Sequence, residues 1–179
     1  ILDGSNSFSN PVNINGGTLQ IGNGDNSGSI NSPVVNNGTL IFNRSNSFSF
    51  SQIISGTGNL IKEGEGTLTL SGNNTYNGST SINSGILQLG AANVIPHGAS
   101  KGDVFLSGTL DLNSYSDTID GLSGNGIVNN STAGTPVLTI GANNANSAFG
   151  GSIRNSAGTL GLTKIGSGTI VLTGDNTYE

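Results

Sequence analysis

The chain has 179 residues and a formal net charge of −5, and Gly, Asn, Ser and Thr account for 98 of its residues. It contains no Cys, which excludes disulfides and thiolate metal sites, and its five basic residues are too scattered to form a nucleic-acid interface. No apolar run approaches the roughly 18 residues of a membrane span. A composition this polar is typical of disorder, but the apolar residues recur in short, alternating blocks, which predict an ordered fold.

One short element predicts β-strands along the whole chain: Gly, then Thr or a close substitute, then apolar, polar and apolar residues. Alternation with a period of two is the pattern of a half-buried strand, and the flanking Gly, Asn and Ser favour turns. In chain order the element occupies residues 17–21, 38–42, 66–70, 85–89, 108–112, 158–162 and 168–172, with a Gly-less relative at 136–140.

Longer repeats contain these elements. Residues 60–76 (LIKEGEGTLTLSGNNTY) and 162–178 (LTKIGSGTIVLTGDNTY) are identical at ten of 17 positions without a gap. Residues 3–22 and 71–90 are identical at eight of 20 positions. We therefore expect one segment, 1–179, with repeat copies near 3–22, 55–90 and 157–178. Because a motif restarts where the sequence stops, we expect the segment to be a piece of a longer repetitive protein.

The spacing of the elements predicts how they pack. Most successive elements lie about 20 residues apart, which is shorter than the ~30 residues of a βαβ unit. Each strand buries two or three side chains at about 2 kcal/mol each, against an entropy cost of ~1–2 kcal/mol per ordered residue, so it must stack on copies of itself. The sequence therefore predicts an all-β parallel β-helix, or β-solenoid, of roughly eight coils. An antiparallel sandwich is the alternative, which the short spacing of Leu160 and Ile170 would suit.

In a solenoid the apolar residues of each element point inward, and the Thr, Gln and Asp residues between them point outward. The predicted inward set is Leu19, Ile21, Leu40, Phe42, Leu68, Leu70, Leu87, Leu89, Leu110, Leu112, Leu138, Ile140, Leu160, Leu162, Ile170 and Leu172. The pattern does not assign the strands to particular faces of the solenoid.

Residues 64–90 (GEGTLTLSGNNTYNGSTSINSGILQLG) resemble the passenger-associated repeat of bacterial autotransporters, also called the autotransporter-associated β-strand repeat. Residues 157–178 fit the same pattern, and 4–22 resemble a degenerate copy with Phe8 in place of Tyr76. The resemblance implies a right-handed parallel β-helix at the extracellular surface of the bacterial cell. It further implies export through the outer membrane with a translocator β-barrel elsewhere in the parent protein, and a repeat without cofactors or catalytic residues.

Three acidic residues, Asp111, Asp117 and Asp120, lie within ten positions of each other. Calcium prefers carboxylate oxygens, so the group is a weak candidate for a cation site. The strand pattern places Asp111 on an outward face and the other two in a turn, and we expect a solvated corner instead. His97, in the stretch IPHGAS, is expected in a surface loop.

Tyr76, Tyr178 and Phe8 occupy equivalent positions in the repeats. They could form an exposed aromatic contact surface for sugars, but a large ring buries the most area, so we expect them to cover the coil edges or the core. Lys62 and Lys164 are also equivalent, and repetition of the motif accounts for both.

These observations favour a structural or adhesive stalk segment of a cell-surface protein, without catalysis of its own. Its partners would be glycans or the surface of a host or neighbouring cell. The alternative is a carbohydrate-binding or carbohydrate-active β-helix domain. An enzyme of that kind is expected to carry a long loop insertion and a carboxylate cluster with Arg or Lys, and neither is present in the sequence.

Overall fold

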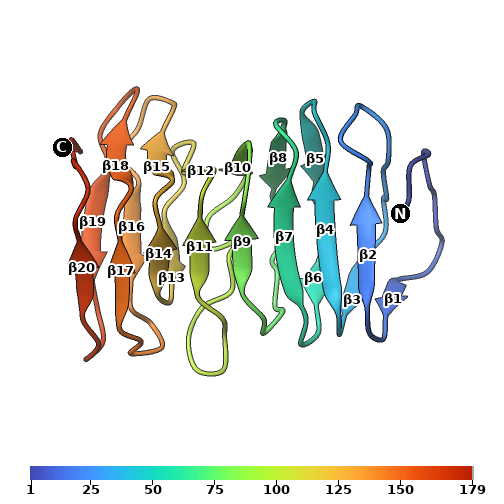
Figure 1. The fold of residues 1–179 in the computed structure, drawn as a ribbon, viewed down its shortest axis with the longest axis horizontal. Coiled ribbons are helices and arrows are strands. Elements are labelled where there is room, and N and C mark those ends of the chain that lie inside the picture. Colours follow the sequence, from blue (N-terminus) through green and yellow to red (C-terminus); the bar gives the residue numbers. More distant parts are fainter. Residues whose placement is uncertain (179) are drawn as a thin grey trace.

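A computed structural model describes residues 1–178 and shows a column of stacked coils with the two termini at opposite ends (Figure 1). Twenty strands form four sheets in this part of the chain, and every strand pairing is parallel. The predicted parallel solenoid is therefore confirmed, and the antiparallel sandwich is excluded. The described residues contain no helix, and so none long and apolar enough to cross a bilayer.

The longest sheet gives the number of coils, since each coil contributes one strand to it. We call this the eight-stranded side, and it consists of β2 (Thr18–Ile21), β4 (Thr39–Asn43), β7 (Asn59–Glu63), β9 (Thr80–Ile82), β11 (Val104–Leu106), β14 (Leu122–Gly124), β17 (Ser147–Phe149) and β20 (Ile170–Leu172). Paired residues such as Leu40 and Leu60 lie about one coil apart, which agrees with the predicted repeat of about 20 residues. The prediction of roughly eight coils is confirmed.

A second sheet follows the first in six of the coils. We call it the six-stranded side, and it consists of β5 (Phe48–Phe50), β8 (Thr67–Leu70), β10 (Ile86–Leu89), β12 (Thr109–Asp111), β15 (Ile127–Asn130) and β18 (Ser152–Asn155).

The third side of the coils carries two shorter sheets. One consists of β1 (Val12–Ile14), β3 (Val34–Asn36) and β6 (Ile54–Ser55), and the other of β13 (Asp117–Ile119), β16 (Val137–Ile140) and β19 (Gly161–Lys164). Between them lie the segments 71–79 and 90–103, which run along this side without forming strands.

The alternating pattern of the strands produces a continuous core between the three sides. In β8, Leu68 and Leu70 are buried while Thr67 and Thr69 are half-buried on the outside. Most residues of the predicted inward set are buried. Four are only partly buried: Leu19, Leu162, Ile170 and Leu172. These four lie near the ends of the column, in coils that have few neighbouring coils to cover them.

Tight turns join the sides, and glycine is required where the backbone adopts a positive φ. Gly64 has φ +69° in the turn between β7 and β8, and a Cβ there would lie 2.5 Å from the carbonyl oxygen of Arg44 in the preceding coil. A side chain at this position would separate adjacent coils.

The repeat copies do not share one orientation in the column. Residues 59–63 form β7 on the eight-stranded side, but the equivalent residues of the last copy form β19 on the third side. The next strands, β8 and β20, are displaced in the same way. The middle copy is therefore rotated by one side relative to the last copy.

Candidate functional site

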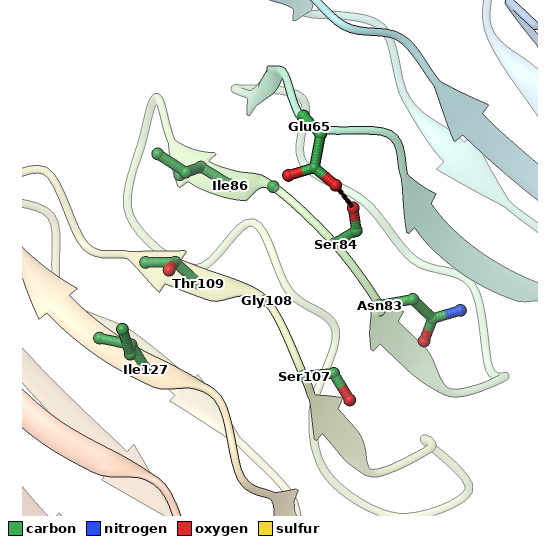
Figure 2. Close-up of a pocket in the computed structure, with 9 residues that line it drawn as sticks. Glu65, Asn83, Ser84, Ile86, Ser107, Gly108, Thr109 and Ile127 are labelled. Atoms are coloured by element: carbon green, nitrogen blue, oxygen red, sulfur yellow. Dashed lines mark hydrogen bonds between the residues drawn. The ribbon is translucent and has the colours of Figure 1, made fainter. Parts of the chain in front are cut away.

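A surface depression runs along the corner between the eight-stranded and six-stranded sides (Figure 2). It is a shallow groove with a volume of about 500 Å³ that crosses several successive coils. The lining residues are Glu65, Asn83, Ser84, Gly85, Ile86, Ser107, Gly108, Thr109 and Ile127. They come from the turns before β8, β10 and β12 and from the starts of the following strands.

Hydrogen bonds between successive coils hold the polar side chains of this groove in place. Ser84 Oγ donates to Glu65 Oε1 at 2.8 Å, as Figure 2 shows. Asn83, the residue before Ser84, makes a similar bond, since its Nδ2 donates to Glu63 Oε1 at 2.6 Å. The hydroxyls of Ser107 and Thr109 and the apolar side chains of Ile86 and Ile127 complete the lining. The groove can thus offer hydrogen-bonding groups beside apolar surface, at the regular interval of one coil.

Lys62 supports the same corner from inside. Its ammonium donates to the carbonyl oxygens of Glu63 (2.6 Å), Gly64 (2.7 Å) and Ser84 (3.2 Å), and the last of these belongs to the next coil. The side chain is 2 % exposed, and burial lowers the pKa of Lys62 to about 8 despite the opposing charges of the two glutamates. Lys62 is therefore a connection between coils.

The first of the three predicted acidic candidates, Asp111, is buried on the six-stranded side, which contradicts the expected solvated corner. Its Oδ2 accepts from Gln88 Nε2 (2.9 Å) and Ser131 Oγ (2.6 Å), and its Oδ1 accepts from the backbone N–H groups of Asn113 and Ser131 (both 3.1 Å). Gln88 in turn accepts from Thr69 Oγ1. Donors of its own and of the neighbouring coils thus satisfy both oxygens of the carboxylate. Without such partners a buried carboxylate would be costly.

Asp117 and Asp120 are also buried, at 1 % and 0 % exposure, so the expectation that they are solvated is wrong for them too. They lie at β13 on the third side, where they accept backbone N–H groups of the segment 90–103. They do not share a site with Asp111, which belongs to another side of the column. Residues 1–178 contain no group of three or more His, Cys, Asp or Glu side chains placed to hold a metal ion.

The three equivalent aromatic residues do not form a common surface. Tyr76 is fully buried, and its hydroxyl lies 2.6 Å from Thr80 Oγ1, so a surface contact through Tyr76 is excluded. Phe8 is 40 % exposed near the first strand of the column, and Tyr178 is half-buried after the last strand, β20. His97 is exposed in the segment 90–103, as expected.

Sequence reasoning did not single out the groove or the role of Asn74. Asn74 accepts from the N–H of Ile54 and donates to the carbonyl of Val94, both at 2.9 Å, so it connects three coils where the third side lacks strands. Its signal is the recurrence of Asn two residues before the repeat aromatic, in Asn74 and Asn176. The signal for the groove is a polar residue before each strand-initiating glycine, as in Ser84 and Ser107.

The column and its recurring motifs define a parallel solenoid built from repeats. Three stretches of the chain, 1–21, 60–89 and 162–179, match the family model described as passenger-associated-transport-repeat. The chain therefore carries autotransporter passenger repeats, as its motifs predicted. These stretches overlap the copies expected near 3–22, 55–90 and 157–178.

A curated relative agrees with the repeats. Over 127 residues, which are 70 % of this chain, the sequence is 35 % identical to the adhesin BmaC autotransporter of Brucella suis biovar 1 (strain 1330). The matched region is 4 % of the length of that adhesin. No solved structure matches the chain.

Proposed function

We propose that this chain is a structural and adhesive segment of an autotransporter passenger, displayed at the extracellular surface of a bacterial cell. The observation that carries the proposal is the presence of three passenger-associated repeats within one uninterrupted solenoid. Such a column holds its ends far apart, so it suits a stalk that carries other parts of the protein away from the cell. Export would use a translocator β-barrel in the parent protein.

The segment is proposed to have no catalysis of its own. The carboxylate of Asp111 is occupied by donors from neighbouring coils, and those of Asp117 and Asp120 accept backbone N–H groups. An acid or base in catalysis must instead reach a substrate. The alternative of a carbohydrate-active domain has no observation in its favour among the described residues.

The adhesive contact is proposed to use the groove lined by Glu65, Ser84, Ser107 and Thr109, with glycans or the surface of a host or neighbouring cell as partner. The hydroxyl groups of two successive coils and the carboxylate of Glu65 can hydrogen-bond to an extended polar polymer.

Surface display tests both parts of the proposal. The chain is fused to an autotransporter translocator in a Gram-negative cell and compared with a spacer of equal length. We expect protease-accessible display, and we expect the cells to bind a panel of immobilised host glycans more strongly than cells with the spacer. Retention of the chain inside the cell would contradict the passenger role, and binding equal to that of the spacer would contradict the adhesive role alone.

A pair of variants locates the contact. Thr109→Lys places a long charged side chain in the groove, whereas Thr139→Lys changes a comparable half-buried Thr on the third side. Binding to the glycan panel is expected to fall several-fold for Thr109→Lys and to stay unchanged for Thr139→Lys. An equal effect of both variants would exclude the groove as the contact surface.

A further inference from the structure

The segment 90–103, between β10 and β11, is held by carboxylates where other coils are held by strand pairing. Asp117 Oδ2 accepts from the N–H groups of Val94 (3.0 Å) and Ile95 (3.3 Å). Asp120 Oδ1 accepts from the N–H of Gly98 at 2.8 Å. Since parallel strands would supply backbone carbonyls as acceptors here, the two side chains substitute for the missing ladder.

Each of these carboxyl groups has one oxygen without a partner. Asp117 Oδ1 and Asp120 Oδ2 are buried, and neither has a hydrogen-bond partner among the described residues. A buried carboxylate with an unpaired oxygen is costly because its charge is not solvated. The neutral carboxylic acid keeps the other oxygen as acceptor and costs less to bury, although its O–H has no acceptor at the unpaired position. The geometry therefore suits the protonated state better than the ionised one.

The groups around Asp117 do not remove its preference for the protonated state. Tyr76 interacts with Asp117 from the core, and the paired strand β16 contributes Leu138 and no titratable side chain. Burial raises the pKa of Asp117 to about 7, against the opposing effect of the backbone N–H donors.

Asp120 has charged neighbours of both kinds. Burial raises its pKa, the like charge of Asp103 raises it further, and His97 acts in the opposite direction. Lys101, the remaining charged group of the segment, is turned away to the preceding coils, where its ammonium donates to the carbonyl of Thr75 (2.7 Å) and to Asn77 Oδ1 (2.6 Å).

We propose that the segment 90–103 is a pH-gated flap, closed when Asp117 and Asp120 are protonated and loosened when they are ionised. The flap forms one wall of a surface cavity of about 190 Å³, through Asn93, Ile95, Pro96, His97 and Lys101, and the preceding coil forms the other wall. Loosening the flap opens this cavity and frees the exposed His97 loop, while the sheets of the column stay paired. The gate is separate from the proposed stalk function and does not depend on it.

The direction of the pH effect follows from proton binding. When the flap opens, Asp117 becomes solvated and returns to the ordinary pKa of about 3.9, so opening releases a proton at any pH between that value and about 7. The closed state is therefore most stable below pH of about 4. Its population relative to the open state falls by up to about tenfold per pH unit as the pH rises to about 7, and it levels off above that.

Asn74 provides a matched control inside the same molecule. Like Asp117, it accepts a backbone N–H of the neighbouring coil on the third side, in this case that of Ile54 at 2.9 Å, but its carboxamide does not titrate. The N–H of Ile54 should therefore be protected equally at every pH at which those of Val94 and Ile95 change.

Amide hydrogen exchange of the 179-residue chain between pH 4.5 and 8 tests the flap, with rates corrected for the intrinsic pH dependence of exchange. We expect protection at Val94 and Ile95 to fall by at least tenfold up to pH 7, with constant protection at Ile54. Asp117→Asn, which copies the carboxamide of Asn74, is expected to reduce the dependence at Val94 and Ile95 and to leave the part that Asp120 contributes, whereas Asp3→Asn at the first coil keeps it in full. Equal pH dependence at Ile54 and Val94 in the unmodified chain would overturn the proposal, even if Asp117→Asn failed to fold.

Discussion

The two best-matched repeats, 60–76 and 162–178, are identical at ten of 17 positions but have different surroundings. The first begins on the eight-stranded side with β7, and the second begins on the third side with β19. The motif therefore encodes a unit of strand, turn and strand that fits at least two different pairs of sides of the column. The physical reason is that every side buries alternate residues against the same core, so the motif has no feature that distinguishes one side from another.

Equivalent residues of the two repeats consequently differ in burial and partners. Lys62 donates to a carbonyl of the following coil, whereas Lys164 is exposed and donates to the carbonyls of Ile165 and Gly166 in its own turn. Asn74 bridges two neighbouring coils, whereas Asn176 accepts from Ile153 and donates within its own turn, to Gly174. Position in the column thus decides how much each copy of a motif residue contributes to stability.

The aromatic position should show the largest difference between the repeats. Replacing Tyr76 with Ala removes a fully buried ring and is expected to lower the free energy of unfolding by about 3–5 kcal/mol. Tyr178→Ala removes a half-buried ring in the last coil and should have a clearly smaller effect. Urea denaturation followed by far-UV circular dichroism measures both, and equal losses would show that burial does not govern this position.

The motif asparagine should show a smaller difference. Asn74→Ala leaves the N–H of Ile54 and the carbonyl of Val94 without their partner, so we expect a loss of about 2–4 kcal/mol. Asn176→Ala breaks one connection between coils, to Ile153, and is expected to cost about 1 kcal/mol. Denaturant midpoints of the two variants give the comparison, which would fail if Asn176→Ala were the more damaging.

The two repeats should differ least in the stability that is lost when the lysine is replaced. Lys62→Met removes an ammonium that satisfies three backbone carbonyls, and we expect a loss of about 1–2 kcal/mol near pH 7. Lys164→Met, at an exposed position, serves as the matched control and should leave the denaturant midpoint almost unchanged.

Lys62 also predicts a pH dependence that Lys164 does not share. Because the pKa of Lys62 is lowered to about 8 in the folded chain, the charged form is disfavoured by folding. This penalty is fully present below pH 8 and is relieved as the pH rises from about 8 to the unfolded value of about 10.4. The unmodified chain should gain stability over that range relative to Lys62→Met, and parallel stability curves would contradict the assignment.

Much of the fold could be predicted because a solenoid is specified by local patterns. The alternation in the stretch 66–70 determines which of its residues are buried, and the spacing of about 20 residues determines the coil length. Asp111 lies on the outward face of its strand, as predicted. The prediction that it is solvated was wrong, since Gln88 and Ser131 of the neighbouring coils contact its carboxylate. The exposed contact predicted as one possibility for Tyr76 was wrong, because the ring is fully buried in the core.

By itself, the sequence determined the parallel stacking, the coil number, the kinship with passenger repeats and seven of the twenty strands, because all of these follow from periodic patterns within about 20 residues. The element predicted at 158–162 was wrong in its bounds, since the strand there begins only at Gly161. Only the tertiary structure decided which side each repeat occupies, which equivalent residues become connections between coils, and where the strand ladder is replaced by side chains. The replacement by Asn74 and Asp117 depends on the segments 71–79 and 90–103 lying beside other coils. The recurring Asn of the motif marks the position, but it does not show which backbone groups of the other coils the side chain contacts.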